Sequence, residues 1–299
     1  MIDEPMAEFT RRQIRSVTQA ALAKADVAGI VPTPLEALSR VCGIVETIDI
    51  SALPSDTIAK RPFALKRILG AVFYRERLVF VDRAQGDARA RFTHAHELSH
   101  KLLPWHEALY RLDDYERLFG AVKKRLDAEA DAGAADLLFQ GDVFGRRALE
   151  YKVSMSAPIA LAADFGTSYH AAIRYYVEHH PDAVALVVAG RYRRTNGKVP
   201  IFGTFESPSF RLQFGSIAKL VGGDALEAIA ERHDPIGELV AAAFSDADVV
   251  SAEVDLASLG GGSHPVVAEA FYNQHSMFVM FADARAARRL GRRVRVAVR

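Results

Sequence analysis

The stretch that decides the fold spans residues 94–100 and reads His94-Ala95-His96-Glu97-Leu98-Ser99-His100. It contains the spacing His-Glu-x-x-His. On an α-helix, His96 and His100 are one turn apart and project from the same face. Two imidazoles at that spacing can hold one tetrahedral Zn²⁺ ion. The stretch therefore predicts a helix that contributes two ligands to a zinc site.

Glu97 follows the first of these histidines and is rotated by about 100° from it around the helix. Its carboxylate is therefore expected to border a metal-bound water without ligating the metal. Such a carboxylate can take the proton as the water attacks a carbonyl carbon, which is the minimum equipment for peptide hydrolysis. We expect Glu97 to act as the general base.

The flanking residues also favour a helix. Residues 91–95 contain no helix breaker, and Leu98, Leu102 and Leu103 form an apolar stripe. Pro104 is expected to end the helix, because proline removes a backbone hydrogen bond and clashes with the preceding turn. A surface helix with scattered histidines is the less favoured interpretation.

Composition limits the class of protein. The 299 residues, half of them hydrophobic, predict a globular chain of two domains. The net charge of +1 argues against a protein whose whole surface binds nucleic acid. The single cysteine, Cys42, excludes an internal disulfide and is expected to be a small buried hydrophobe. The absence of an apolar signal core and of a long apolar run predicts a cytoplasmic protein with no membrane partner.

The first 140 residues predict helices and short strands. Residues 33–36 read Thr-Pro-Leu-Glu, a helix start in which Thr33 caps and Glu36 reaches back, and Gly43 is expected to end that helix in a left-handed conformation. The other predicted elements are a helix over 9–26, a strand over 45–50, a hairpin over 67–74 and 77–81, and a long helix over 115–139.

The pattern of predicted helices and strands changes in the second half of the sequence. Two helices are expected within 157–177, joined at residues 166–168. After Pro181 we expect an α+β domain. Its predicted elements are a hairpin of 183–194 and 199–205 with a turn at 196–197, strands over 210–214, 249–254 and 276–281, and helices over 226–232 and 237–244. The arginine-rich tail, 285–299, is expected to be a solvated helix and an edge strand.

A catalytic zinc site needs a third protein ligand. The second long helix offers three carboxylates. Asp127 shares a face with Ala130 and Ala134, the small apolar face expected to pack inward, so it is the favoured ligand. Asp131, one turn further on, is placed to orient a ligating histidine from outside the metal. Glu129 lies on a more polar face but has the longer reach, and it stays open as the alternative ligand.

Several of these segments resemble the ImmA/IrrE-type metallopeptidases. Residues 91–100 look like the lead-in and zinc helix of that family. Residues 127–138 are similar to its second signature, a carboxylate ligand followed by Ala-Asn, Phe-Ala-Ala and Leu-Leu-Met-Pro. Residues 34–44 fit its first helix and strand, and 161–177 resemble its small helix-turn-helix-like segment. The resemblance covers about residues 10–180.

The chain departs from the family pattern at four positions. The family's glutamate ligand falls on Asp127, whose side chain is one methylene shorter and needs closer helices. Asp131 replaces the usual asparagine, and Gln140 replaces the usual proline. Gly133 stands where phenylalanine is common, which leaves space that another side chain must fill. These changes bear on the strength of metal binding more than on the fold.

The resemblance implies an α+β fold with two domains. The first, 1–180, is a helical, zincin-like metallopeptidase domain with a small β-sheet and includes the helix-turn-helix-like segment 157–180. The second, 181–299, is a mixed α/β domain, and the texture of this segment is compatible with the GAF-like sensor that some family members carry. The implied cofactor is Zn²⁺.

The function that the resemblance implies is a zinc-dependent endopeptidase that cleaves a DNA-binding, helix-turn-helix repressor in a stress or mobile-element response. His96, His100 and Asp127 hold the metal, Glu97 is the base and Asp131 supports a ligand. Tyr169 and His170 are weak candidates for stabilising the oxyanion, and His94 and His106 are expected to be solvated or to lie behind the ligands.

Two other functions compete with this one. The aspartate in place of glutamate motivates a regulatory binding module, in which the same scaffold binds a repressor or antitoxin-like partner without efficient cleavage. Direct DNA binding through 161–177 and the arginine tail is disfavoured, because that helical segment offers only Arg174 as a basic side chain. The sequence gives no oligomeric state.

Overall fold

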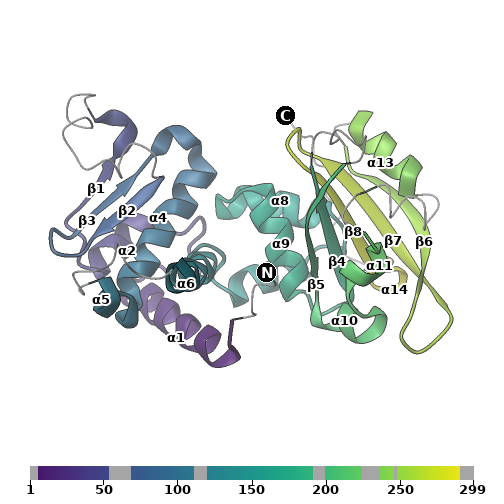
Figure 1. Ribbon diagram of the computed structural model, residues 1–299, viewed down its shortest axis with the longest axis horizontal. Helices are drawn as coiled ribbons and strands as arrows, with labels where there is room; N and C mark the ends of the chain where they lie inside the picture. The colour runs from purple at the N-terminus through teal and green to yellow at the C-terminus, as the bar shows by residue number, and fades with distance from the viewer. Residues whose placement is uncertain are drawn as a thin grey trace. The chain divides into compact units, whose positions relative to one another are not determined.

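The computed structural model describes residues 6–53, 69–110, 120–190, 199–223, 226, 236–245 and 248–289. The chain forms two compact units, each with its own sheet and helices (Figure 1). The first unit comprises the chain up to residue 143 together with 164–168, and the second comprises 144–163 and the chain from residue 169 on. The predicted mixed α+β class is confirmed.

The first unit contains a three-stranded sheet in the order β1-β3-β2. Strand β1 (Glu46–Asp49) runs parallel to β3 (Leu78–Val81), and β2 (Gly70–Phe73) pairs with β3 in antiparallel fashion. The predicted hairpin is therefore confirmed in its described part, whereas residues 67 and 68 lie outside the described residues. Within the part of the chain that the structure describes, β2 is an edge strand of this sheet.

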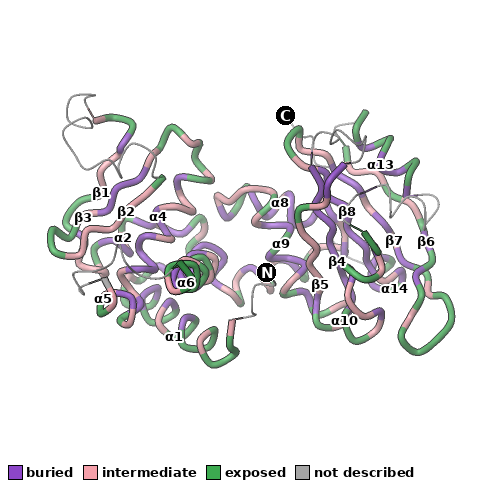
Figure 2. Tube along the Cα trace, viewed as in Figure 1, coloured by how far each residue is buried: buried purple, intermediate pink, exposed green. Residues whose placement is uncertain are grey.

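Helices cover this sheet and build the centre of the first unit. They are α1 (Glu8–Lys24), α2 (Leu35–Val41), α4 (Asp87–Leu102), α5 (Pro104–Tyr110) and α6 (Gly120–Phe139). Helix α4 ends two residues before Pro104, as expected. Both α1 and α4 pack against α6, so α6 is buried over much of its circumference (Figure 2). The predicted long helix is confirmed from residue 120 on; residues 115–119 are not described.

The start of α2 differs from the expected capping box. The N-cap position is Pro34, and no side chain caps the helix. The Thr33 hydroxyl instead donates to the Leu137 carbonyl oxygen at 2.9 Å, near the end of α6. A tertiary hydrogen bond thus replaces the local cap, because the chain before α2 lies against α6. The expected stop at Gly43 is confirmed by its left-handed φ of 72°.

Gln140 follows the last residue of α6 and ties it to the same loop. Its amide nitrogen donates to the Ile30 carbonyl oxygen at 2.8 Å and to the Thr33 hydroxyl at 3.0 Å. Its amide oxygen accepts a hydrogen bond from the Gly29 backbone at 2.6 Å. A glutamine here therefore ends the helix by binding a neighbouring segment.

The second unit contains a five-stranded antiparallel sheet in the order β5-β4-β8-β7-β6. The strands are β4 (Val184–Ala189), β5 (Ile201–Glu206), β6 (Val250–Ala257), β7 (Ser263–Tyr272) and β8 (Met277–Asp283). Every residue of β4 is buried, which requires cover on both faces of the sheet. The predicted antiparallel pairing of β4 and β5 is confirmed, but their turn at 196–197 lies outside the described residues.

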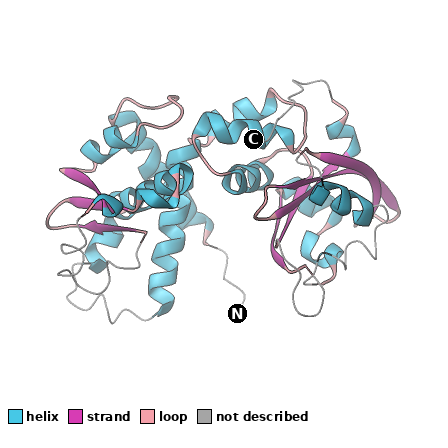
Figure 3. Ribbon diagram, turned by 90° about the horizontal axis from the view of Figure 1, so that it is seen from above, coloured by secondary structure: helices cyan, strands magenta, loops and turns pink. Residues whose placement is uncertain are grey.

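Helices pack on both faces of this sheet (Figure 3). Helices α10 (Pro208–Phe214), α11 (Ile217–Val221) and α13 (Ile236–Ser245) share a core with Ala185 and Val187. Helix α9 (Tyr169–His179) lies on the other face, where the Tyr169 and Phe271 ring centroids are 5.8 Å apart. The described residues also form helices α7 (Asp142–Leu149), α8 (Ser156–Phe165) and α14 (Ala284–Ala287).

These contacts bear on the division of the chain. The sequence predicted a boundary near residue 180, with 157–180 as part of the first domain. In the structure, α8 and α9 are separate helices, as expected, but α9 and most of α8 belong to the second unit. The expected boundary therefore falls inside that unit, because its sheet has a second apolar face that α9 covers.

One prediction in the second half needs correction, and one strand was missed. Residues 210–214 were expected to be a strand but lie in α10, because the Ser207 hydroxyl caps Phe210 at 3.1 Å and Pro208 occupies the first turn. Strand β7 was not predicted at all. The predicted helix over 226–232, apart from Leu226, and the tail beyond residue 289 lie outside the described residues. None of the described helices is long and apolar enough to cross a membrane.

Candidate metal centre

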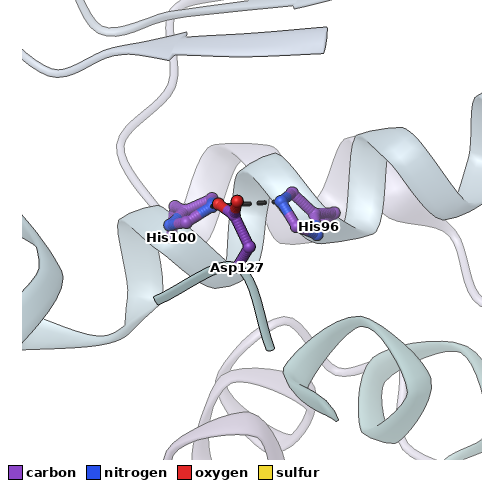
Figure 4. A group of neighbouring side chains, drawn as sticks. All are labelled: His96, His100 and Asp127. Atoms are coloured by element: carbon purple, nitrogen blue, oxygen red, sulfur yellow. Dashed lines mark hydrogen bonds and ion pairs between the residues drawn. The ribbon is translucent and has the colours of Figure 1, made fainter. Parts of the chain in front are cut away.

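Helix α4 presents His96 and His100 on one face, as their spacing requires (Figure 4). Their Nε2 atoms lie 3.0 Å apart. His100 is almost completely buried, with 3% of its surface exposed, and His96 is partly buried. The two imidazoles therefore converge on one point at the surface of the helix.

Asp127 reaches the same point from α6 (Figure 4). Its Oδ1 atom lies 3.8 Å from Nε2 of His100. One ligand atom from each of these three residues lies within 4.8 Å of the others. Because α4 and α6 pack closely, the short aspartate side chain spans the distance between the helices.

The three residues fit a tetrahedral metal ion. Zinc bonds to imidazole nitrogen and carboxylate oxygen are about 2.0–2.2 Å long, so tetrahedral geometry separates two ligand atoms by roughly 3.3 Å. The Nε2–Nε2 distance of 3.0 Å and the Nε2–Oδ1 distance of 3.8 Å bracket that separation. Two imidazoles and one carboxylate also leave a fourth position for water or substrate.

Asp131 lies behind His96. Its Oδ1 atom is 2.8 Å from Nδ1 of His96. A carboxylate only accepts, so Nδ1 carries the hydrogen, and Nε2 of a neutral His96 bears the lone pair. This contact orients the ring in the way that carboxylates support metal-ligating histidines.

Glu97 is buried beside the two histidines. Burial raises the pKa of its carboxyl to about 7, while His96 acts to lower it and Asp127 to raise it. The backbone N–H of Val72 on β2 donates to this carboxylate. A Cβ atom at Gly70 would lie 3.0 Å from Oε1 of Glu97, so the edge strand runs close over the carboxylate.

Glu129 points to a different cluster. Its Oε2 atom accepts a hydrogen bond from the Trp105 indole at 2.6 Å and lies 3.0 Å from Nε2 of His106. Glu129 was expected on a more polar face, but it is buried, because α6 packs against α4 and α1. Asp127, and not Glu129, therefore lies with the two histidines.

His106 lies behind His100 and not in solvent, which is the second of the two places expected for it. It is fully buried, and its Nδ1 atom lies 2.8 Å from Nδ1 of His100. Helical spacing on α4 could not reveal this contact, because Pro104 starts a new helix and changes the chain direction. No pattern of prolines and histidines in the sequence therefore predicts the contact between His100 and His106.

The other expected residues lie elsewhere. His94 is buried, with Nε2 3.0 Å from the Ser39 hydroxyl, so it is not solvated. Tyr169 and His170 belong to the second unit and contact the Phe271 and Phe278 rings.

The site thus has the composition of a mononuclear metal centre with a carboxyl group beside it. Residues 54–174 match the profile of the peptidase M78 family, described as the IrrE N-terminal-like domain. This match confirms the resemblance to ImmA/IrrE-type metallopeptidases that the motifs predicted.

A solved structure described as a Mycobacterium tuberculosis transcriptional regulator has a similar fold, with a TM-score of 0.54 and 13% sequence identity. The likeness covers 96% of this chain and 94% of the other, so it extends over both units. None of the curated proteins compared matches the chain.

Proposed function

We propose that this protein is a zinc-dependent endopeptidase. The observation that carries the proposal is the convergence of His96, His100 and Asp127 beside the buried carboxyl of Glu97. The family of residues 54–174 supports the same chemistry. A Zn²⁺ ion held by the three ligands would lower the pKa of a bound water to about 7 and polarise the scissile carbonyl.

Glu97 then moves the proton. Its carboxylate accepts a proton from the attacking water and delivers it to the leaving amine as the peptide bond breaks. A pKa of about 7 suits both steps near neutral pH, because the group is then able to accept and to donate. Burial, the main cause of the raised pKa, also keeps bulk water from competing for the proton.

The edge strand β2 offers a place for an extended substrate. The Val72 N–H points from β2 toward Glu97 rather than toward β3, so the outward edge of the sheet faces the catalytic carboxyl. A peptide added along this edge would form main-chain hydrogen bonds and pass the metal position in an extended form. That geometry suits cleavage within a chain rather than at its end.

The proposed substrate is a helix-turn-helix repressor in the cytoplasm, cleaved in a stress or mobile-element response. The resemblance of the motifs to ImmA/IrrE-type peptidases supports this choice. So does the likeness of the whole chain to a solved structure described as a transcriptional regulator. The part of the chain from residue 181 on is then proposed to sense the signal, as GAF-like domains do.

One observation favours a second function, a regulatory module that binds its partner without efficient cleavage. Asp127 is 44% exposed and lies 3.8 Å from His100, which suggests a weaker ligand than a glutamate. In that case a bound repressor would be sequestered and not cut.

The test pairs the wild-type chain with Glu97→Gln, which removes the base and keeps the side-chain volume. Each zinc-loaded protein is incubated with the helix-turn-helix repressor encoded beside its gene, and the products are identified by mass spectrometry. We expect one specific cut by the wild type and at least about 100-fold slower cleavage by the variant. Binding without a cut by either protein would instead support the regulatory module.

A further inference from the structure

A buried row of hydrogen-bonded side chains leads from His100 away from the metal position. Nδ1 of His100 lies 2.8 Å from Nδ1 of His106, and Nε2 of His106 lies 3.0 Å from Oε2 of Glu129. The exposed fractions of the three residues are 3%, 0% and 5%. This row of side chains runs from α4 through α5 to α6. Neither His106 nor Glu129 is among the proposed ligands.

The carboxylate of Glu129, at the far end of this row, determines which nitrogen atoms donate. A carboxylate only accepts, so Nε2 of His106 carries a hydrogen and donates to Glu129. A neutral imidazole has one N–H group, so Nδ1 of His106 is an acceptor. Nδ1 of His100, 2.8 Å away, must then be the donor. The lone pair of His100 is therefore on Nε2, the atom that points at Nε2 of His96.

Trp105 holds the carboxylate of Glu129, which is the final acceptor in this row of side chains. An indole nitrogen can only donate, and it lies 2.6 Å from the same Glu129 oxygen that contacts His106. Nε of Arg125 lies 3.6 Å from the other carboxylate oxygen. Both neighbours are donors, so they hold the carboxylate where it accepts from His106, and the hydrogen bonds are donated from α4 through α5 to α6.

We propose that Glu129 and His106 are positioning residues that hold His100 in the tautomer required for metal binding. This inference rests on the proposed metal centre. Asp131 does the same for His96 through one direct contact, whereas Glu129 acts on His100 through a second imidazole. Glu129, the alternative ligand expected from the sequence, thus has a role two residues removed from the metal.

The test uses a matched pair of substitutions in the full chain. Leucine and asparagine have nearly the same shape, but only asparagine places an acceptor oxygen near the position of Nδ1. We expect His106→Leu to weaken zinc affinity by roughly 10- to 100-fold, measured by competition with a chromophoric chelator. His106→Asn should stay within about threefold of the wild type, since the acceptor is restored. Equal affinity in both variants, whether lowered or unchanged, would overturn the proposal.

A second measurement needs no substitution. In the metal-free wild type, long-range ¹H–¹⁵N spectra of the imidazoles should show the His100 hydrogen on Nδ1. Finding it on Nε2 would overturn the proposal even if every variant failed to fold. If the wild type binds no zinc but His100 has the expected tautomer, the proposed metal function fails and the positioning role stands.

Discussion

A Cβ atom at Gly133 would lie 2.8 Å from Oγ and 2.9 Å from Cβ of Ser99, so helices α6 and α4 are in direct backbone-to-side-chain contact at this pair. This close approach brings Asp127, less than two turns before Gly133, within reach of the two histidines. The space expected beside Gly133 is thus filled by α4 itself and by Ile14 of α1.

We predict that Gly133→Ala destabilises the protein by about 1–3 kcal/mol, although alanine is the better helix former, because the added methyl group overpacks the contact. Gly145→Ala in α7 is the matched control, since a Cβ atom there meets nothing within 4 Å. It should leave stability unchanged or raise it by up to about 1 kcal/mol. Urea unfolding measures both, and a Gly133→Ala protein as stable as its control would contradict this packing.

A similar contact links the edge strand β2 to helix α4. A Cβ atom at Gly70 would meet Cγ2 of Thr93 and lie 3.0 Å from Oε1 of Glu97. We expect Gly70→Ala to displace Glu97 and to lower peptidase activity about tenfold or more while zinc content is kept. Adding Thr93→Ser removes Cγ2 and should restore part of the activity. Unaltered activity in Gly70→Ala would show that β2 does not constrain Glu97.

The sequence predicted the centre of the site better than its surroundings. The spacing of His96 and His100 determines their common face on any helix, and the face of Ala130 and Ala134 indicated Asp127. His106 was expected in solvent or behind a ligand, but its contact with His100 could not be predicted, because that contact depends on how the chain turns at Pro104. Helix periodicity describes one element at a time, whereas such contacts depend on where two elements meet.

The fold shows the same limit. Helices with strong periodicity or clear ends, such as α4 and α9, were predicted. Strand β7 was missed, and a strand was expected over 210–214, where the structure has α10 because the Ser207 cap and Pro208 start a helix. The sequence also placed α9 with the first domain, since nothing local reveals that its apolar face meets the second sheet.

The third ligand can be tested by changing carboxylates one at a time. Asp127→Ala should lower zinc affinity by at least roughly tenfold, because two histidines alone hold the ion poorly. Asp127→Glu should keep the metal, since it restores the residue type of the resembled family. Asp87→Ala, which removes an exposed carboxylate from the first turn of α4, is the control. Zinc affinity that is the same in Asp127→Ala and the control would rule out Asp127 as a ligand.

Asp136 should give the stability a pH dependence. Burial raises the pKa of this carboxyl to about 6, although Arg15 and Arg11 act to lower it. Because its pKa is higher in the folded state, its ionisation costs stability, and the cost grows as the pH rises from about 4 through 6. Asp136→Asn should therefore gain about 1–3 kcal/mol at pH 7.5 and little at pH 4. Denaturant unfolding at both pH values measures the gain, and an equal effect at the two would refute the role of ionisation.

The zinc content of the purified chain tests the central claim most directly. The wild type, His96→Ala and His100→Ala are each equilibrated with zinc, dialysed and measured by elemental analysis, with circular dichroism to verify folding. We predict about one zinc per chain in the wild type and close to none in either folded variant. A folded wild type that retains no zinc, or full zinc in either variant, would contradict the assignment of this site as the metal centre.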